Sequence, residues 1–135
     1  MKVFVGGSKN IGVLPERALR KIDEYVDGDG HILVGDCHGV DLAVQKHLSE
    51  RGAKNVTVYC SGQKPRFNIG GWSVVALGNA ELSDYAFYAL KDARMVRDAD
   101  CGLMVWNGAT RGTARNIQEF KKLNKPVEII AYEND

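Results

Sequence analysis

The chain has 135 residues, 44% of them hydrophobic and 26% charged, with a formal net charge of +1; these values are typical of a globular domain that buries a core without disulfides, and we expect one domain over residues 1–135. A net charge near zero gives no long-range electrostatic attraction to nucleic acid or to an anionic membrane surface, so any basic site must be local. No apolar run approaches the roughly 18 residues of a membrane-spanning helix, and the start "MKVFVGG" lacks the long apolar stretch of a signal peptide.

Short apolar runs alternate with amphipathic patterns along the chain. The predicted strands are "KVFVG" (2–6), "HILVG" (31–35), "VTVYC" (56–60), "GLMVW" (102–106) and "VEIIAY" (127–132). The predicted helices, which repeat apolar residues at helical spacing, cover 14–26, 39–52, 83–100 and 112–124. The connection from Ser61 to Ala80 shows no clear pattern, which is typical of a functional lid or of a short element that the pattern hides.

Strands that alternate with helices predict a mostly parallel sheet joined by right-handed crossovers. "VFV" and "GLMVW" are apolar throughout, as expected of strands covered on both faces. "VTVYC" alternates and "VEIIAY" contains Glu128, which favours a position at the sheet edges for both. We therefore predict an α/β fold with a doubly wound, mostly parallel five-stranded sheet in the order 3-2-1-4-5 and helices on both faces.

Three glycine-containing turns follow the first, second and fourth predicted strands: "GGSKN", "GDCHGVD" and "NGATRGT". Ligands of open parallel sheets bind outside the carboxyl ends of the strands, so these turns should meet at one edge. Glycine lets a backbone approach a ligand closely, and a helix that starts directly afterwards directs free N–H groups at an anion. Taken alone, each turn is explained equally well as a strand-to-helix connection that needs glycine for packing and as part of a ligand-binding site. Together they indicate a nucleotide or phosphosugar site.

The predicted binding residues come from these turns and from one helix. Backbone N–H groups would surround a phosphate or ribose at Gly6, Gly7, Gly35, Gly39, Gly108 and Gly112. Hydrogen-bond donors and charges would come from Ser8, Thr110, Thr113, Lys9, Lys91 and Arg111, with Asp41 holding sugar hydroxyls. The predicted set also includes Asp36, Cys37 and Asn107. For Asp41, attraction to the helix dipole is an equally good explanation.

Two common cofactor motifs are missing. "GGSKNIG" does not match GxGxxG, and no acidic residue closes the strand "HILVG" to hold a ribose hydroxyl. No GxxxxGK[ST] sequence forms a P-loop. A dinucleotide cofactor and a P-loop nucleotide are therefore disfavoured, and we expect no cofactor.

The three cysteines, Cys37, Cys60 and Cys101, are odd in number and in no CxxC arrangement, which favours a reducing cytoplasm over a disulfide framework. Together with His38 and His47 they lack the spacing of a zinc site, so no metal is expected. Cys37 precedes a predicted helix, where the pKa of a thiol can fall. Since adjacent helical residues do not face each other, His38 is not placed to activate it. We interpret Cys37 as a small residue in a tight turn rather than a nucleophile.

The stretches "VFVGGSKNI", "ILVGDCHGVDLAVQKHLSERG", "KDARMVRDADCGLMVWNGATRGTARNI" and "NKPVEII" resemble the SLOG superfamily, which includes the DNA-processing protein DprA, the Lonely-guy (LOG) enzymes and the YspA-like proteins. The YspA-like branch is the most similar: its "GGARGAD" motif resembles "GDCHGVD", its "RN..M" motif resembles "KDARM", and its glycine–serine and "SRGT" turns resemble Gly6–Ser8 and Thr110–Thr113. This resemblance implies a Rossmann-like domain over residues 1–135 that binds a nucleotide or a nucleotide-derived, phosphoribose-containing ligand at the three turns.

The resemblance does not extend to catalysis. In LOG enzymes the motif "PGGxGTxxE" supplies a glutamate for cleaving an N-glycosidic bond, whereas "GTARN" places Asn116 there, and an amide cannot act as a general base or attacking carboxylate. The arginine of the LOG motif "RKAxM" becomes Lys91, which keeps the charge but loses the bidentate fork. The alternative is a nucleotide N-glycosidase or phosphoribohydrolase in which Asp36, Asp41 or Asp92 replaces the glutamate.

A third alternative, nucleic-acid binding as in DprA, is disfavoured by the near-neutral charge and by the missing basic stripe with interleaved aromatics. In the long connection, Lys64 and Arg66 could close over phosphates or simply be solvated. Trp106 could stack on a base or cap the core. The apolar run "YAFYAL" (85–90) could pair copies of the chain in a homodimer or a higher homo-oligomer, or it could be buried within one copy.

Overall fold

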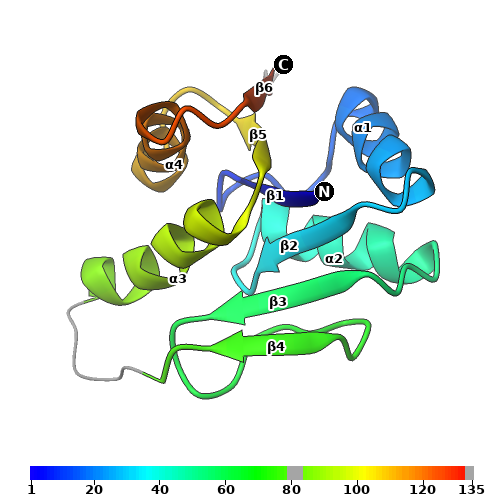
Figure 1. Ribbon diagram of the computed structural model, residues 1–135, viewed down its shortest axis with the longest axis horizontal. Helices are drawn as coiled ribbons and strands as arrows, with labels where there is room; N and C mark the ends of the chain where they lie inside the picture. Colours follow the sequence, from blue (N-terminus) through cyan, green and yellow to red (C-terminus); the bar gives the residue numbers. More distant parts are fainter. Residues whose placement is uncertain (79–83, 133–135) are drawn as a thin grey trace.

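The computed structural model describes residues 1–78 and 84–132, and within the helix that begins at 84 it describes all side chains except those of residues 84, 85, 87 and 88 (Figure 1). Its strands are β1 (Lys2–Gly7), β2 (His31–Gly35), β3 (Val56–Cys60), β4 (Ser73–Ala76), β5 (Cys101–Trp106) and β6 (Val127–Ala131). Its helices are α1 (Glu16–Asp27), α2 (Val40–Glu50), α3 (Asp84–Asp98) and α4 (Arg111–Lys122).

The strands form one six-stranded parallel sheet in the order β4-β3-β2-β1-β5-β6. The predicted α/β class and the order of the five predicted strands are confirmed, and β6 lies at an edge as expected. The sixth strand, β4, lies in the long connection, where four residues are too few to show a periodic pattern.

Because β4 pairs with β3, the prediction that β3 forms a sheet edge was wrong. The alternation that suggested an edge has another cause. Thr57 of β3 lies 2.7 Å from the Nε2 atom of His31 on β2, measured from its Oγ1 atom. The polar position in β3 is therefore satisfied by a neighbouring strand rather than by water.

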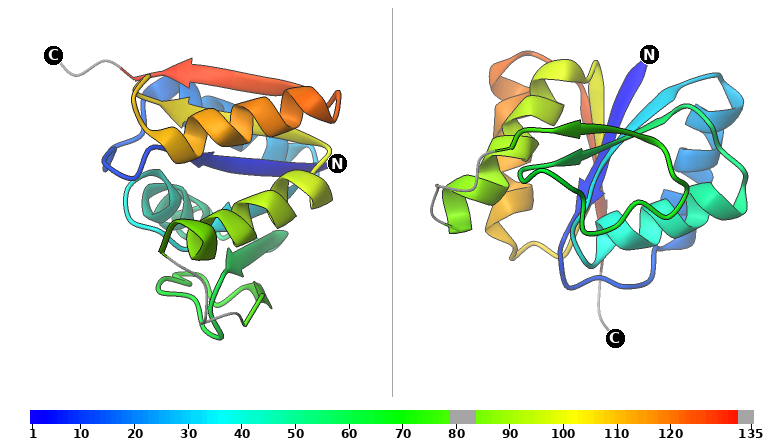
Figure 2. Two further views of the ribbon diagram at one scale, coloured as in Figure 1. Left: turned by 90° about the vertical axis from the view of Figure 1, so that its left-hand side faces the viewer. Right: turned by 90° about the horizontal axis from the view of Figure 1, so that it is seen from below.

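Helices cover both faces of the sheet, α1 and α2 on one and α3 and α4 on the other (Figure 2). Successive strand residues point to opposite faces, so Val3 and Val5 pack against α1 and α2, while Phe4 packs against α3 and α4. All three are at least 98% buried. Burying each such side chain stabilises the fold by roughly 1.5–3 kcal/mol.

The chain reverses its winding between β1 and β5, which are hydrogen-bonded neighbours at the centre of the sheet. The crossover that leaves β1 runs over the α1 face, whereas the crossover that leaves β5 runs over the α4 face. A crevice at the carboxyl ends of the strands is expected at such a reversal.

No helix among the described residues is long and apolar enough to cross a membrane. The apolar run 85–90 lies at the start of α3. The side chains of Tyr85, Phe87 and Tyr88 lie outside the described residues. Pairing of two copies through this run therefore stays a prediction.

Candidate functional site

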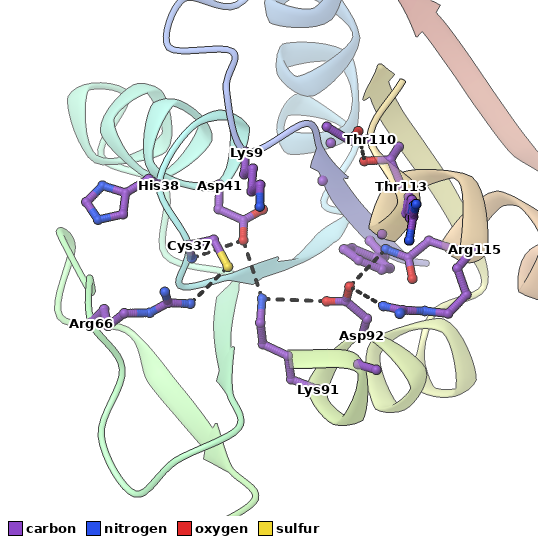
Figure 3. Close-up of a pocket in the computed structure, with 17 residues that line it drawn as sticks. Lys9, Cys37, His38, Asp41, Arg66, Lys91, Asp92, Thr110, Thr113 and Arg115 are labelled. Atoms are coloured by element: carbon purple, nitrogen blue, oxygen red, sulfur yellow. Dashed lines mark hydrogen bonds and ion pairs between the residues drawn. The ribbon is translucent and has the colours of Figure 1, made fainter. Parts of the chain in front are cut away.

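A pocket of about 700 Å³ opens at the carboxyl ends of the central strands (Figure 3). This volume lies within the range of roughly 300–1,000 Å³ found for small-molecule sites. All three glycine turns contribute to it. The predicted residues that line it are Gly6, Gly7, Lys9, Cys37, Asp41, Lys91, Thr110, Arg111, Gly112 and Thr113.

Six predicted residues do not line this pocket: Ser8, Gly35, Asp36, Gly39, Asn107 and Gly108. Asn107 instead turns toward the first loop, where its Nδ2 atom donates to Asn10 Oδ1 at 3.0 Å. Its Oδ1 atom accepts from the N–H groups of Ala109 (2.9 Å) and Thr110 (3.2 Å). Asn107 therefore shapes the last glycine turn from outside the pocket.

Three hydroxyl groups tie the first turn to the last. The N–H of Asn107 donates to Ser8 Oγ at 3.2 Å, the hydroxyls of Ser8 and Thr110 lie 2.8 Å apart, and Thr110 donates to Thr113 Oγ1 at 3.2 Å. Since Thr110 gives its proton to Thr113, Ser8 must be the donor to Thr110. Within the described part of the chain, the Thr113 hydroxyl has no acceptor for its own proton. That proton can be donated to a ligand.

One end of the pocket is formed by the start of α4. Thr110 occupies the N-cap position, but its side chain makes no capping hydrogen bond. The first-turn N–H groups of Arg111, Gly112 and Thr113 lack intrahelical acceptors, and the helix dipole makes this end partly positive. Arg111 in this turn is exposed, as is Lys9, which Figure 3 places nearer to Asp41 at the middle of the pocket, and neither forms an ion pair with any described residue. This end is therefore suited to an anion.

The middle of the pocket holds a buried ionic cluster around Lys91, which is 3% exposed. Its Nζ atom lies 3.5 Å from Asp92 Oδ1, 3.6 Å from Asp41 Oδ2 and 3.8 Å from Asp36 Oδ1. Burial disfavours the ammonium, but Asp92 and Asp41 outweigh it and raise the pKa of Lys91 above its usual value. Lys91 therefore stays charged and acts first as the counter-ion of three carboxylates, rather than as a cation reserved for a ligand.

Asp41 belongs to this cluster more than to the open pocket. Burial raises its pKa, against the opposing effect of Lys91. The N–H of Cys37 donates to Asp41 Oδ2 at 3.1 Å. A Cβ atom at Gly35 would collide with Asp41 Oδ2 and Lys91 Nζ, so glycine at this position makes room for the ion pair. The second glycine turn therefore positions the buried ion pair of Asp41 and Lys91, through the space left at Gly35 and the N–H group of Cys37.

Asp92 lies beside Asn116, which stands at the position of the glutamate in the LOG motif that the sequence resembles. Asn116 is buried, and its Nδ2 atom donates to Asp92 Oδ2 at 3.3 Å. Arg115 donates to the same oxygen at 3.1 Å, while Lys91 faces the other. Both oxygens of Asp92 are therefore already engaged. Of the three catalytic candidates, Asp41 and Asp92 line the pocket and Asp36 does not.

The far wall of the pocket comes from the connection after β3. The N–H of Arg66 donates to Asp36 Oδ2 at 3.0 Å, and its Nη2 atom donates to Asp36 Oδ1 at 3.3 Å and to Cys37 Sγ at 2.9 Å. Burial raises the pKa of the Cys37 thiol, which argues against a nucleophilic thiolate. Lys64 is exposed and does not line the pocket.

The sequence also raised Trp106 as a residue that could stack on a base, and a metal site. The Nε1 atom of Trp106 donates to Thr110 O at 3.1 Å, and the ring packs against the core beneath α3 and α4 without lining the pocket. Among the described residues, no group of three His, Cys, Asp or Glu side chains is arranged to hold a metal ion.

The lining also includes residues that were not among the predicted binding residues: Phe4, His38, Arg66, Ala89, Asp92, Arg115 and Asn116. Arg115 had a usable signal, because it lies four residues after Arg111 and therefore on the same face of α4. Arg66, considered from the sequence only as a residue that could close over phosphates, reaches the pocket because the long connection folds back over it. His38 belongs to the second glycine turn, where the sequence did not single it out as a binding residue.

Comparisons with known proteins bear on the fold. No family model and no curated protein matches the chain. DNA processing protein A of Helicobacter pylori shares its fold with a TM-score of 0.76 and 11% identity, over 100% of this chain and 67% of that protein. DprA of Streptococcus pneumoniae does so with a TM-score of 0.73 and 16% identity, over 98% of this chain and 50% of that protein. At these identities the likeness shows a DprA-like, Rossmann-like fold, as the SLOG resemblance implies; the YspA-like branch stays a prediction.

The H. pylori protein binds single-stranded DNA. The prediction that nucleic acid is disfavoured as a partner is therefore wrong. The prediction rested on a net charge of +1, but a net charge averages over the whole surface. Five basic side chains and two carboxylates line the pocket, namely Lys9, Arg66, Lys91, Arg111, Arg115, Asp41 and Asp92. Lys91 is balanced by its carboxylates, but Lys9 and Arg111 form no ion pair with any described residue, so a protein with a net charge near zero can still carry local positive charge.

Proposed function

We propose that this protein binds a nucleotide or a nucleotide-derived, phosphoribose-containing ligand through its phosphate, at the end of the pocket formed by α4. The observation that supports this most strongly is a single juxtaposition. The uncapped first turn of α4, the available Thr113 proton and the exposed cations Lys9 and Arg111 all face one pocket. A phosphate with several acceptor oxygens matches several N–H donors and a positive helix end.

The carboxylates beside this end are suited to a sugar. Asp41 and Asp92 line the middle of the pocket, and carboxylate oxygens accept hydrogen bonds from hydroxyl groups. Their charge is balanced by Lys91, so they do not repel a phosphate as strongly as unpaired carboxylates would. A phosphate joined to a sugar therefore fits the order of the chemical groups.

Binding is favoured over bond cleavage by the same contacts. Both oxygens of Asp92 are engaged, Asp41 is buried against Lys91, and Asp36 lies behind the pocket wall. None of the three is placed as an unengaged attacking group. Incubation with nucleoside monophosphates, followed by chromatography for released base, tests the enzymatic alternative. Release that depends on one of these aspartates, replaced singly by asparagine, would establish cleavage.

A second candidate is a single strand of nucleic acid whose phosphate occupies the same end. It is favoured by the single-stranded DNA binding of the H. pylori protein, which shares the fold. A strand offers the same phosphate, sugar and base as a free nucleotide. It differs in that its affinity falls steeply with salt when several phosphates are contacted.

Thermal shift distinguishes these ligands. Nucleoside mono-, di- and triphosphates, NAD derivatives and a short single-stranded oligonucleotide are compared, because any ligand of the folded state raises the melting temperature. We expect a rise with at least one of them, and a smaller rise for Arg111→Ala than for the control Lys64→Ala. If none changes the melting temperature at millimolar concentration, the proposed function is wrong. A rise with the oligonucleotide alone would favour the second candidate.

A further inference from the structure

The end of the pocket away from α4 presents two planar side chains, His38 and Arg66 (Figure 3). His38 is exposed at the pocket, and its ring meets that of Phe67 edge to face, with centroids 4.9 Å apart and planes at 77°. The Arg66 guanidinium is held by Asp36 Oδ1 at 3.3 Å and Cys37 Sγ at 2.9 Å. Each planar group is therefore supported from one side by a second residue.

The backbone that carries Arg66 and Phe67 is fastened by the buried side chain of Gln45. Its Nε2 atom donates to Gly35 O at 2.9 Å and to Phe67 O at 3.0 Å, and its Oε1 atom accepts from the N–H of Ile69 at 3.0 Å. Gln45 has no exposed surface. A buried amide with these bonds holds the connection firmly against the end of β2, because each bond lost would leave a buried polar group unpaired. The planar end of the pocket is thus preformed.

The chemical groups follow a fixed order across the strand ends. The anion-binding end follows β5, the glycines Gly6 and Gly7 end β1, and His38 follows β2, with β1 between the other two strands. Since adjacent strands lie about 4.8 Å apart, the two outer positions are separated by roughly 10 Å. Figure 3 shows Asp41 of α2 and Asp92 of α3 between the pair His38 and Arg66 on one side and Thr113 on the other. Planar groups, carboxylates and donors therefore succeed one another across the pocket, as base, sugar and phosphate do along a nucleotide.

We propose that His38 and Arg66 form a subsite for the nucleobase, a role that rests on the proposed function of the pocket. The base stacks on the His38 imidazole and contacts the Arg66 guanidinium, both of which are known to stack on bases in proteins. Stacking is tolerant of base identity because every base has a π-face. The subsite therefore separates nucleotides from sugar phosphates and discriminates weakly among bases.

Calorimetric titration with adenosine 5′-monophosphate and with ribose 5-phosphate tests this subsite, because ribose 5-phosphate has the same sugar and phosphate but a hydroxyl group in place of the base. The native protein should bind the nucleotide roughly 5- to 100-fold more tightly than the sugar phosphate, as expected for one stacked base. His38→Ala should reduce this ratio at least threefold without changing the affinity for ribose 5-phosphate. His38→Phe should retain it. Arg66→Lys keeps a charge beside Asp36 but loses the plane, and should also reduce the ratio.

The control variants separate this subsite from the phosphate site. Lys64→Ala, in the same connection but outside the pocket lining, should leave both affinities unchanged. Arg111→Ala should weaken both ligands by the same factor. An unchanged ratio in His38→Ala and Arg66→Lys, or equal affinities for the two ligands in the native protein, would overturn the base subsite while leaving the phosphate site standing. Binding of neither ligand would overturn the base subsite, and the phosphate site is overturned with it when the thermal-shift series is also negative.

Discussion

Replacing Lys91 by methionine should strongly destabilise the fold. The substitution keeps a similar side-chain volume but removes the cation that lies 3.5–3.8 Å from three carboxylates. Lys91 and its partners Asp36 and Asp41 are all more than 90% buried, so water cannot replace the lost charge. Removing one partner from a buried ion pair costs about 3–5 kcal/mol. In a chain of this length, that corresponds to a fall of roughly 10–20 °C in melting temperature.

The effect of this substitution should depend on pH with a defined sign. The pKa of Lys91 is raised in the folded protein, so its stabilising contribution is present below the usual lysine pKa of 10.5 and is lost as the pH rises above that value. In the variant, the carboxylates face one another without a cation. Burial already raises the pKa of Asp41, and loss of Lys91 should raise it further. The difference in unfolding free energy should therefore shrink as the pH falls toward 4 and the carboxylates take up protons.

Urea denaturation followed by circular dichroism measures this difference across the pH range. Lys46→Met is the matched control, because Lys46 is exposed on α2 and its loss should change the unfolding free energy by less than about 0.5 kcal/mol. Adding Asp41→Asn to Lys91→Met should restore part of the stability. A variant within about 1 kcal/mol of the native protein at neutral pH, or a loss that acidification does not reduce, would refute the reasoning.

Three further substitutions have separate readouts. Gly39→Ala should lower the free energy of unfolding by more than about 1 kcal/mol, because Gly39 has a φ of +78° and an added Cβ would collide with the Lys9 backbone; an unchanged melting temperature would contradict this. Gln45→Ala should speed proteolytic cleavage within residues 62–72, because the backbone groups of Gly35, Phe67 and Ile69 lose their partner; unchanged cleavage would mean that other contacts hold this connection. Arg111→Ala should weaken nucleoside monophosphate binding roughly tenfold or more while leaving stability unchanged, and equal titration curves would exclude a role for Arg111.

The layout of the fold was predictable because it depends on local patterns. Runs such as Val3–Val5 and Leu103–Val105 are apolar at every position, and they form the two central strands covered on both faces. The edge was less predictable. β4 has only four residues, and Thr57 in β3 mimics an edge residue because a hydrogen bond to His31 replaces the solvent contact.

The pocket was predictable at its turns and not in its wall or its charge pairing. Glycine and threonine positions such as Gly6 and Thr113 follow strands directly, so topology alone brings them to one edge. Arg66 reaches the same edge through an irregular connection, which leaves no periodic signal. The role of Lys91 depends on its neighbour Asp92 and on Asp36 and Asp41 from the second glycine turn, and only their arrangement in space shows that its charge is already balanced.

The most direct measurement of the central claim is a titration of the ¹⁵N-labelled protein with a nucleoside 5′-monophosphate, followed by the backbone amide resonances. If a phosphate binds at the start of α4, the amides of Arg111, Gly112 and Thr113 should shift by more than those of distant helices, and inorganic phosphate should move the same amides more weakly. Amides of α4 that stay unchanged while others shift, or no shifts at millimolar ligand, would contradict a phosphate site at this helix.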